Sequence, residues 1–174
     1  MPVTDFFAIL DMPAGCQLDL QLLDAQYRKR QAVWHPDRFV NAPESEKRQA
    51  LQQTSLLNDA YNILKQPLRR AEHLLDLRLC ESGEVVVDKL EPAFLLQQLE
   101  WREELEQLDT LRNEPALASL RHRVEAALAL HWQVIEADIA RHDWCAARLS
   151  LQKLQFLKKL QDELNHLEDR WLEN

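Results

Sequence analysis

Apolar residues recur every three or four positions along most of this chain, and this spacing constrains its fold more than any other feature. The clearest stretch lies near the C-terminal end and consists of Leu157, Leu160, Leu164, Leu167 and Trp171. Residues with this spacing line one face of an α-helix. The chain also holds only two glycines and is dominated by strong helix formers such as Leu, Ala, Glu and Gln. The sequence therefore predicts an all-α fold.

The first part of the chain is expected to hold four helices with a polar tripeptide between the second and the third. These helices are predicted over residues 5–10, 20–34, 43–65 and 68–77. Asp19 is a plausible N-cap for the second helix. After that helix comes His35-Pro36-Asp37, where Pro36 lacks a backbone donor and disfavours helical geometry at His35. We therefore expect a compact polar loop between two antiparallel helices.

A second domain is expected after a break in the helical pattern. The break covers residues 80–91 and contains Ser82-Gly83, the best turn signal in the chain. We therefore predict an N-terminal domain over residues 1–79, a linker over residues 80–91 and a C-terminal domain over residues 92–174. Helices are expected in the last domain over residues 92–112, 115–141 and 143–171. Their short connections predict antiparallel neighbours and a three-helix bundle.

The helix expected over residues 92–112 has two apolar faces, although a surface helix of a bundle needs only one. Its core face is predicted to hold Phe94, Gln98, Trp101, Leu105 and Leu108. The side and far face hold Leu95, Leu96, Leu99, Glu100, Glu103 and Gln107. Leucines ringed by carboxylates indicate a partner site. In the alternative interpretation, Leu95 packs against the first domain and Leu96 and Leu99 are ordinary exposed leucines.

Charge and cysteine content exclude several classes of function. The formal net charge is −8, which is opposite in sign to the charge of a nucleic-acid-binding protein. The three cysteines lie far apart without a CxxC pair, so we expect no disulfide framework, no metal site and no cofactor. The N-terminal residues carry no signal-peptide pattern, and we expect no transmembrane segment and a cytoplasmic location. A nucleophile elbow and a glycine-rich phosphate loop are also missing from the sequence, so an enzyme is not expected.

A small basic cluster precedes the polar tripeptide. Arg28, Lys29 and Arg30 lie within the helix predicted over residues 20–34. In an acidic chain, such a cluster is better interpreted as a site for an acidic protein surface than as a DNA contact. The alternative is a solvated helix face.

Several stretches of the chain resemble known families. Residues 34–39 (Trp-His-Pro-Asp-Arg-Phe), together with Asn58-Asp59-Ala60-Tyr61, resemble a J-domain, the module that stimulates the ATPase of DnaK-type chaperones. The same residues, together with residues 67–75, 94–105 and 154–157, resemble the bacterial HscB family of co-chaperones, which serves iron–sulfur cluster assembly. This resemblance covers essentially the whole chain, and residues 67–75 are its most diagnostic part because general J-domains do not carry them.

The resemblance implies two partners and no catalysis by the chain itself. An HscA-type ATPase chaperone would bind the J-domain at His35, Pro36, Asp37, Arg28, Lys29 and Arg30. The scaffold protein on which clusters are built would bind the C-terminal bundle at Leu95, Leu96, Leu99, Glu100, Glu103 and Phe156. Gln107 stands where the family usually has an acidic residue, so a charge contact there stays open. The alternative function is that of a general J-domain co-chaperone for unfolded clients.

Overall fold

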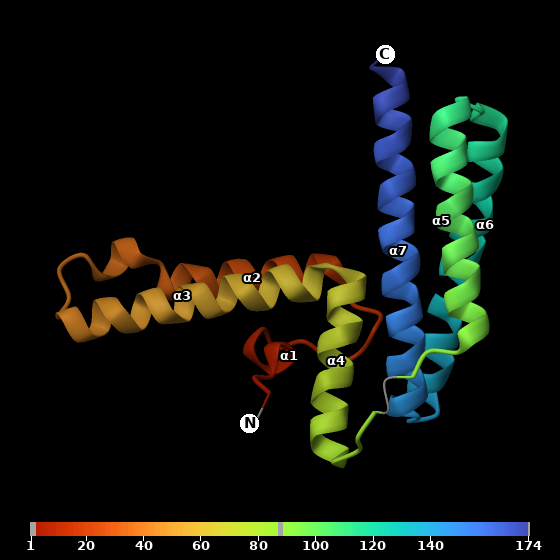
Figure 1. The fold of residues 1–174 in the computed structure, drawn as a ribbon. Helices are drawn as coiled ribbons and strands as arrows, with labels where there is room; N and C mark the ends of the chain where they lie inside the picture. Colours follow the sequence, from red (N-terminus) through yellow and green to blue (C-terminus); the bar gives the residue numbers. More distant parts are fainter. Residues whose placement is uncertain (1–2, 87–88, 174) are drawn as a thin grey trace. The chain divides into compact units, whose positions relative to one another are not determined.

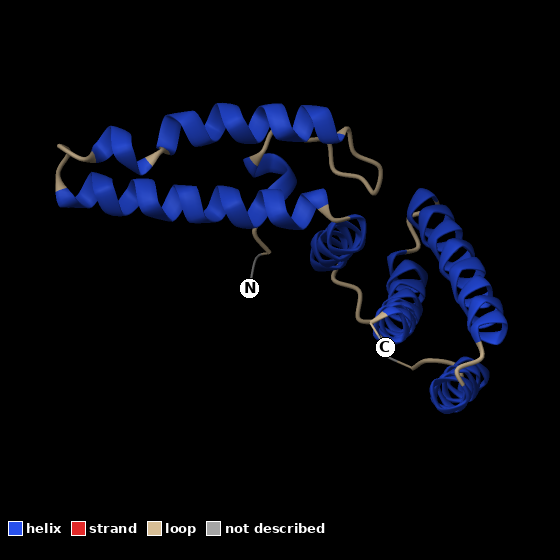
Figure 2. Cartoon of the chain, turned by 90° about the horizontal axis from the view of Figure 1, so that it is seen from above, coloured by secondary structure: helices blue, strands red, loops and turns tan. Residues whose placement is uncertain are grey.

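The computed structural model describes residues 3–86 and 89–173, and every element in them is a helix (Figures 1 and 2). These residues form seven α-helices and one 3-10 helix, which confirms the predicted all-α fold. The chain divides into two compact units, Met1–Gly83 and Glu84–Asn174. Within the described ranges, no helix is both long enough and apolar enough to span a membrane.

A hairpin of two long helices forms the centre of the first unit. Helix α2 (Leu20–Trp34) and helix α3 (Glu44–Lys65) run antiparallel and are joined by the short 3-10 helix η1 (Pro36–Phe39) (Figure 1). Helices α1 (Phe6–Ile9) and α4 (Pro67–Ser82) both pack against α3. As predicted, Asp19 caps α2, because its Oδ1 accepts hydrogen bonds from the amides of Gln21 and Leu22 at 2.9 and 3.1 Å.

Two tyrosines set the register of the α2–α3 hairpin. The rings of Tyr27 and Tyr61 stack with their centroids 4.2 Å apart. The hydroxyl of Tyr27 donates to Asn58 on α3, and the hydroxyl of Tyr61 donates to Asp24 on α2, both at 2.7 Å. Because each half-buried hydroxyl donates to a partner on the opposite helix, a slip of one helix along the other would break both hydrogen bonds.

Buried polar residues of α4 hold the first unit together. The guanidinium of Arg70 donates through Nε to the carbonyl of Cys16 at 2.8 Å and through Nη1 to the carbonyl of Leu64 at 2.6 Å. His73 accepts the amide hydrogen of Phe6 at Nε2, 3.1 Å away. These backbone groups lie at helix ends or in a loop, where no helical partner is available. Arg70 and His73 therefore give part of the diagnostic run of residues 67–75 a structural role.

Helix α4 extends further than the sequence pattern indicates. It includes Cys80, Glu81 and Ser82 and ends at Gly83, whose φ of 71° lies in the left-handed region. The linker predicted over residues 80–91 therefore begins too early, because the helix continues until a glycine can adopt this conformation. Residues 87 and 88 of that linker, and residues 1, 2 and 174 of the predicted domains, lie outside the described residues.

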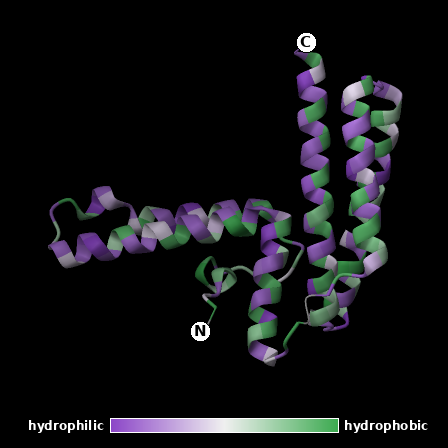
Figure 3. Cartoon of the chain, in the orientation of Figure 1, coloured by the Kyte–Doolittle hydropathy of each residue, from purple (hydrophilic) through white to green (hydrophobic). Residues whose placement is uncertain are grey.

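The second unit is a three-helix bundle of α5 (Pro92–Leu111), α6 (Glu114–Ala140) and α7 (Trp144–Leu172) (Figure 1). Each helix carries both apolar and polar residues along its length (Figure 3), as amphipathic helices around one core require. The side chain of Asp143 caps α7 by accepting the amide hydrogen of Ala146 at 3.0 Å. The predicted stripe of the last helix is also confirmed, since Leu157, Leu160, Leu164 and Leu167 are all buried.

Candidate functional site

The tripeptide His35-Pro36-Asp37 forms a sharp, ordered turn between α2 and α3. His35 ends α2 with φ −58° and ψ 128°, the extended geometry that a following proline favours. Residues Pro36–Phe39 then form one turn of 3-10 helix, where the sequence predicted only a loop. The rings of Trp34 and Phe39 lie nearly parallel on either side of this turn, with centroids 6.1 Å apart.

The two polar side chains of the turn differ in exposure. The side chain of His35 is 50% exposed and that of Asp37 is 86% exposed. The amide of Asp37 donates to Nδ1 of His35 at 3.3 Å, so a neutral His35 carries its hydrogen on Nε2. The carboxylate of Asp37 lies 3.6 Å from Nδ1, a contact that becomes an ion pair only if the imidazole is protonated. Asp37 therefore presents an exposed carboxylate to solvent.

The structure separates the three residues of the basic cluster. Arg28 and Lys29 are exposed and have no partner among the residues that the structure describes. Arg30 instead forms an ion pair with Asp11. Arg30 lies seven positions after the buried Leu23 and therefore on the same packed side of α2. Two cations are thus available on α2, and the third is paired within the first unit.

An apolar hollow beside the turn was missed by the sequence reasoning. Its lining consists of Pro36, Phe39, Val40, Lys47 and Leu51. Val40 and Leu51 are 63% and 58% exposed. Leu51 lies on α3 outside its buried stripe, and this position was the only sequence signal for the feature.

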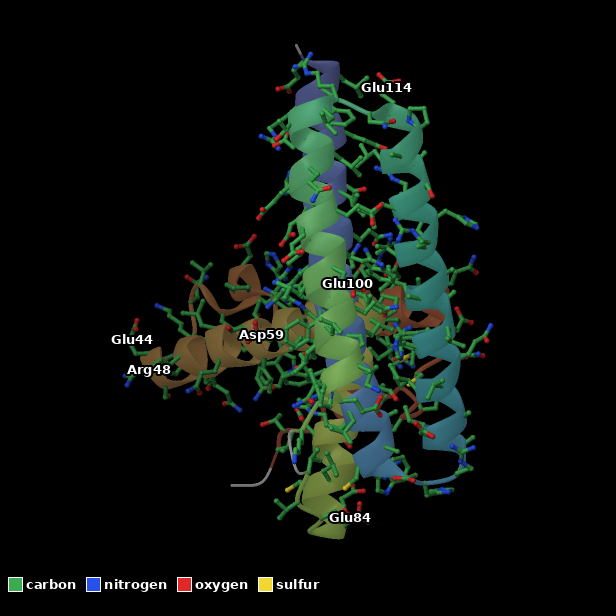
Figure 4. The ribbon with its side chains drawn as sticks, turned by 45° about the vertical axis from the view of Figure 1, so that its right-hand side comes forward. Glu44, Arg48, Asp59, Glu84, Glu100 and Glu114 are labelled. Carbon is green, nitrogen blue, oxygen red and sulfur yellow. The ribbon has the colours of Figure 1, made fainter. Side chains whose placement is uncertain are left out.

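Helix α5 separates its two apolar faces as the sequence predicts. Its core face is buried and consists of Phe94, Gln98, Trp101, Leu105 and Leu108. Leu95, Leu96 and Leu99 are 46, 57 and 55% exposed. Glu100 and Glu103 are exposed beside them and have no partner in the described part of the chain; Glu100 is labelled near the middle of α5 in Figure 4. The described residues thus place an exposed leucine surface on α5.

Phe156 lies on the seam between α5 and α7. Its half-buried ring packs edge to face on Phe94, with the centroids 6.4 Å apart. Arg102 of α5 approaches Glu163 of α7 at 3.9 Å and marks the same seam. Leu95 lies only about 20° from Arg102 around α5, and Leu99 about 60° from it. Phe156 therefore faces the side of the bundle on which these two leucines lie.

The remaining predicted patch residues lie farther around α5. Leu96, Glu103 and Glu100 are about 120, 100 and 160° from Arg102 around the helix. Gln107 is exposed on this same far side, next to the acidic residues. The predicted patch therefore continues from the α5–α7 seam over the outward face of α5, with its carboxylates on the far border.

Acidic charge is concentrated in the second unit. Residues 84–174 contain 18 acidic and 11 basic residues, so they carry −7 of the net charge of −8. Helix α5 alone has five acidic residues and one arginine. A partner that binds this face is therefore expected to be basic. Among the described residues, no three His, Cys, Asp or Glu side chains are grouped in a way that could hold a metal ion.

Comparisons with known proteins agree along nearly the whole chain. A family model described as "HSCB C-terminal oligomerisation domain" matches residues 90–165. Two proteins from Vibrio cholerae serotype O1 strains, both named "Co-chaperone protein HscB homolog", are 37% identical over 169 residues, which is 97% of this chain and 99% of each relative.

Solved structures give the same result. The structure titled "Chaperone HscB from Vibrio cholerae" has a TM-score of 0.81 and 36% identity, and the match covers 96% of this chain and 99% of that one. The structure of human co-chaperone protein HscB has a TM-score of 0.82, with 97% of this chain and 84% of that one covered. The human protein is 23% identical, so its likeness concerns the fold alone.

Proposed function

Because this chain belongs to the HscB family of co-chaperones, we propose that it is an adaptor in iron–sulfur cluster assembly. Its first unit presents the His35-Pro36-Asp37 turn to an HscA-type ATPase chaperone. Its second unit binds the scaffold protein on which clusters are built. The chain accelerates ATP hydrolysis by its partner in the cytoplasm and catalyses no reaction of its own.

The observation that carries this proposal is the exposed carboxylate of Asp37 on an ordered turn. A carboxylate held in this way can form a charge-assisted hydrogen bond with an arginine or lysine of the ATPase. His35 supports the turn by accepting the amide hydrogen of Asp37, and Pro36 restricts its backbone. Arg28 and Lys29, which are unpaired in the described structure, would steer an acidic surface of the ATPase toward the turn. Arg30 contributes less because it is already paired with Asp11.

The scaffold would bind the leucine surface of the second unit. Leu95, Leu96, Leu99 and Phe156 supply apolar contact area, while Glu100 and Glu103 supply negative charge at its border. A scaffold surface that fits has an apolar centre and basic residues around it. Because Gln107 is uncharged, this edge of the leucine surface carries less negative charge than it would with an acidic residue. The apolar centre of the surface is unaffected.

Joining the two binding sites in one chain explains how a non-catalytic adaptor can act. A scaffold bound to the second unit is brought to the ATPase at a high effective concentration. Contact between the turn and the ATPase favours the conformation of that partner which hydrolyses ATP. Binding of the scaffold and stimulation of the ATPase therefore reinforce each other.

We expect Asp37→Ala to reduce stimulation of the HscA-type ATPase at least tenfold while scaffold binding stays unchanged. The matched control is Asp59→Ala, since Asp59 is also exposed and has no partner in the described part of α3 (Figure 4). Steady-state ATP hydrolysis, measured with each variant, distinguishes the two carboxylates. Stimulation by Asp37→Ala at the wild-type level would show that Asp37 is not needed to activate the ATPase.

Self-association of the second unit is a second candidate function. The matching family model is described as an oligomerisation domain, and Leu130 and Val134 on α6 are 59 and 37% exposed. They lie four positions apart and therefore on one face of that helix. Sedimentation equilibrium of the wild type and of Leu130→Ser tests this function. A dimer that the substitution dissociates supports it, and a monomer at all concentrations excludes it.

A further inference from the structure

Two side chains from outside the His35-Pro36-Asp37 tripeptide contact the end of α2. The hydroxyl of Thr54, on α3, donates to the carbonyl oxygen of Trp34 at 2.9 Å. The guanidinium of Arg38, on η1, donates to the carbonyl oxygen of Ala32, also at 2.9 Å. Both carbonyl groups belong to the last turn of α2, where helical backbone donors run out.

These side chains replace two of the backbone donors that the turn removes from the end of α2. In a continuing helix, the carbonyl of Ala32 would accept from the amide of residue 36, but residue 36 is a proline. The carbonyl of Trp34 would accept from the amide of Arg38, but that amide bonds to the carbonyl of His35 at 3.0 Å instead. Thr54 and Arg38 therefore satisfy two of the acceptors that lose their helical donor where the α-helix changes to the 3-10 turn.

We propose that Thr54 and Arg38 are positioning residues that hold the His35-Pro36-Asp37 turn in the geometry presented to the ATPase chaperone. This proposal rests on the proposed function of the turn. Thr54 has a particular part because it belongs to α3 and joins the turn to the opposite helix of the hairpin. Without this hydrogen bond the end of α2 is free to adopt other conformations, and the fraction of molecules that present Asp37 correctly falls.

The test compares Thr54→Val with Thr54→Ser. Valine keeps the size of threonine but removes the hydroxyl, while serine keeps the hydroxyl. We expect Thr54→Val to lower stimulation of an HscA-type ATPase by about three- to tenfold, the range that follows from the net contribution of one hydrogen bond. Thr54→Ser should retain stimulation close to the wild-type level. Ser55→Ala is the matched control, because Ser55 is the exposed neighbour on α3.

A second readout needs no chaperone. Amide hydrogen exchange of Asp37 and Arg38, whose amides bond to His35, should accelerate about three- to tenfold in Thr54→Val. Exchange in the middle of α3 should stay unchanged. This measurement separates a loosened turn from general unfolding.

The outcomes distinguish this proposal from the proposed function. Wild-type stimulation and exchange in Thr54→Val would overturn the positioning role, as would a Thr54→Ser variant that is as defective as Thr54→Val. If the wild type itself fails to stimulate the ATPase, the proposed function is wrong. In that case hydrogen exchange still decides whether Thr54 holds the turn.

Discussion

His73 links the beginning of α1 to α4 through a hydrogen bond that depends on its protonation state. Its Nε2 accepts the amide hydrogen of Phe6, which is possible only while that nitrogen carries no proton. Its ring also stacks on Phe6 with a centroid distance of 4.5 Å. Burial lowers the pKa of His73, although the nearby carboxylates of Asp5 and Asp76 oppose this effect.

The lowered pKa of His73 predicts that the first unit loses stability in mild acid. The unfolded chain, with a histidine pKa of about 6.5, binds a proton more readily than the folded chain. The contribution of neutral His73 is therefore complete above about pH 6.5 and is lost as the pH falls below that value. We expect His73→Gln to flatten the dependence of the free energy of unfolding on pH between about pH 7 and pH 5, measured by urea denaturation.

The exposed His122 provides the control for this measurement. His122→Gln should retain the pH dependence of the wild type. An equally steep pH dependence in His73→Gln would show that His73 is not the titrating group. His131 contributes in the same direction, because burial and the neighbouring Lys153 lower its pKa, so some pH dependence should remain in every variant.

At the scale of helices, the periodic pattern of α5 was sufficient to predict which side chains are buried. All five predicted core residues are buried, and all three leucines of the other face are exposed. The caps at Asp19 and Asp143 were also predictable, because a cap and its amide partners are neighbours in sequence.

Interactions between distant segments could not be predicted in this way. Arg70 reaches Cys16, and Arg30 reaches Asp11, but neither pair has a local pattern. The sequence also gave no sign of Thr54 as a partner of the turn, because that hydrogen bond spans the hairpin. The residues of η1 were predicted only as a loop, because no pattern in the sequence distinguished a single 3-10 turn from one.

The exposure of the leucines on α5 predicts a difference between binding and stability. Leu96→Ala combined with Leu99→Ala should weaken scaffold binding at least tenfold, measured by titration calorimetry, while the melting temperature changes little. Leu105→Ala on the core face should instead destabilise the bundle by about 2–5 kcal/mol.

Thermal unfolding followed by circular dichroism provides the comparison. A double variant that loses as much stability as Leu105→Ala would show that Leu96 and Leu99 belong to the core. Unchanged scaffold affinity in a stable double variant would instead show that Leu96 and Leu99 do not contribute to scaffold binding.

At the scale of the whole molecule, the two units carry different surfaces suited to different partners. The first unit is close to neutral and presents an ordered turn, with two cations on α2 that are free within the described part of the chain. The second unit carries nearly all of the net negative charge and an exposed leucine surface. The family was recognisable from sequence motifs in both units. The net charge of each unit, in contrast, could be assigned only once the boundary between the units was known.

In the proposed adaptor function, one chain couples scaffold binding to activation of an ATPase. The most direct test is steady-state ATP hydrolysis by an HscA-type chaperone, with this protein and the scaffold protein added singly and together. We predict that the two together stimulate hydrolysis by more than the sum of their separate effects. Stimulation that the scaffold leaves unchanged would indicate a general co-chaperone and contradict the adaptor function, and no stimulation under any condition would contradict the role of the turn as well.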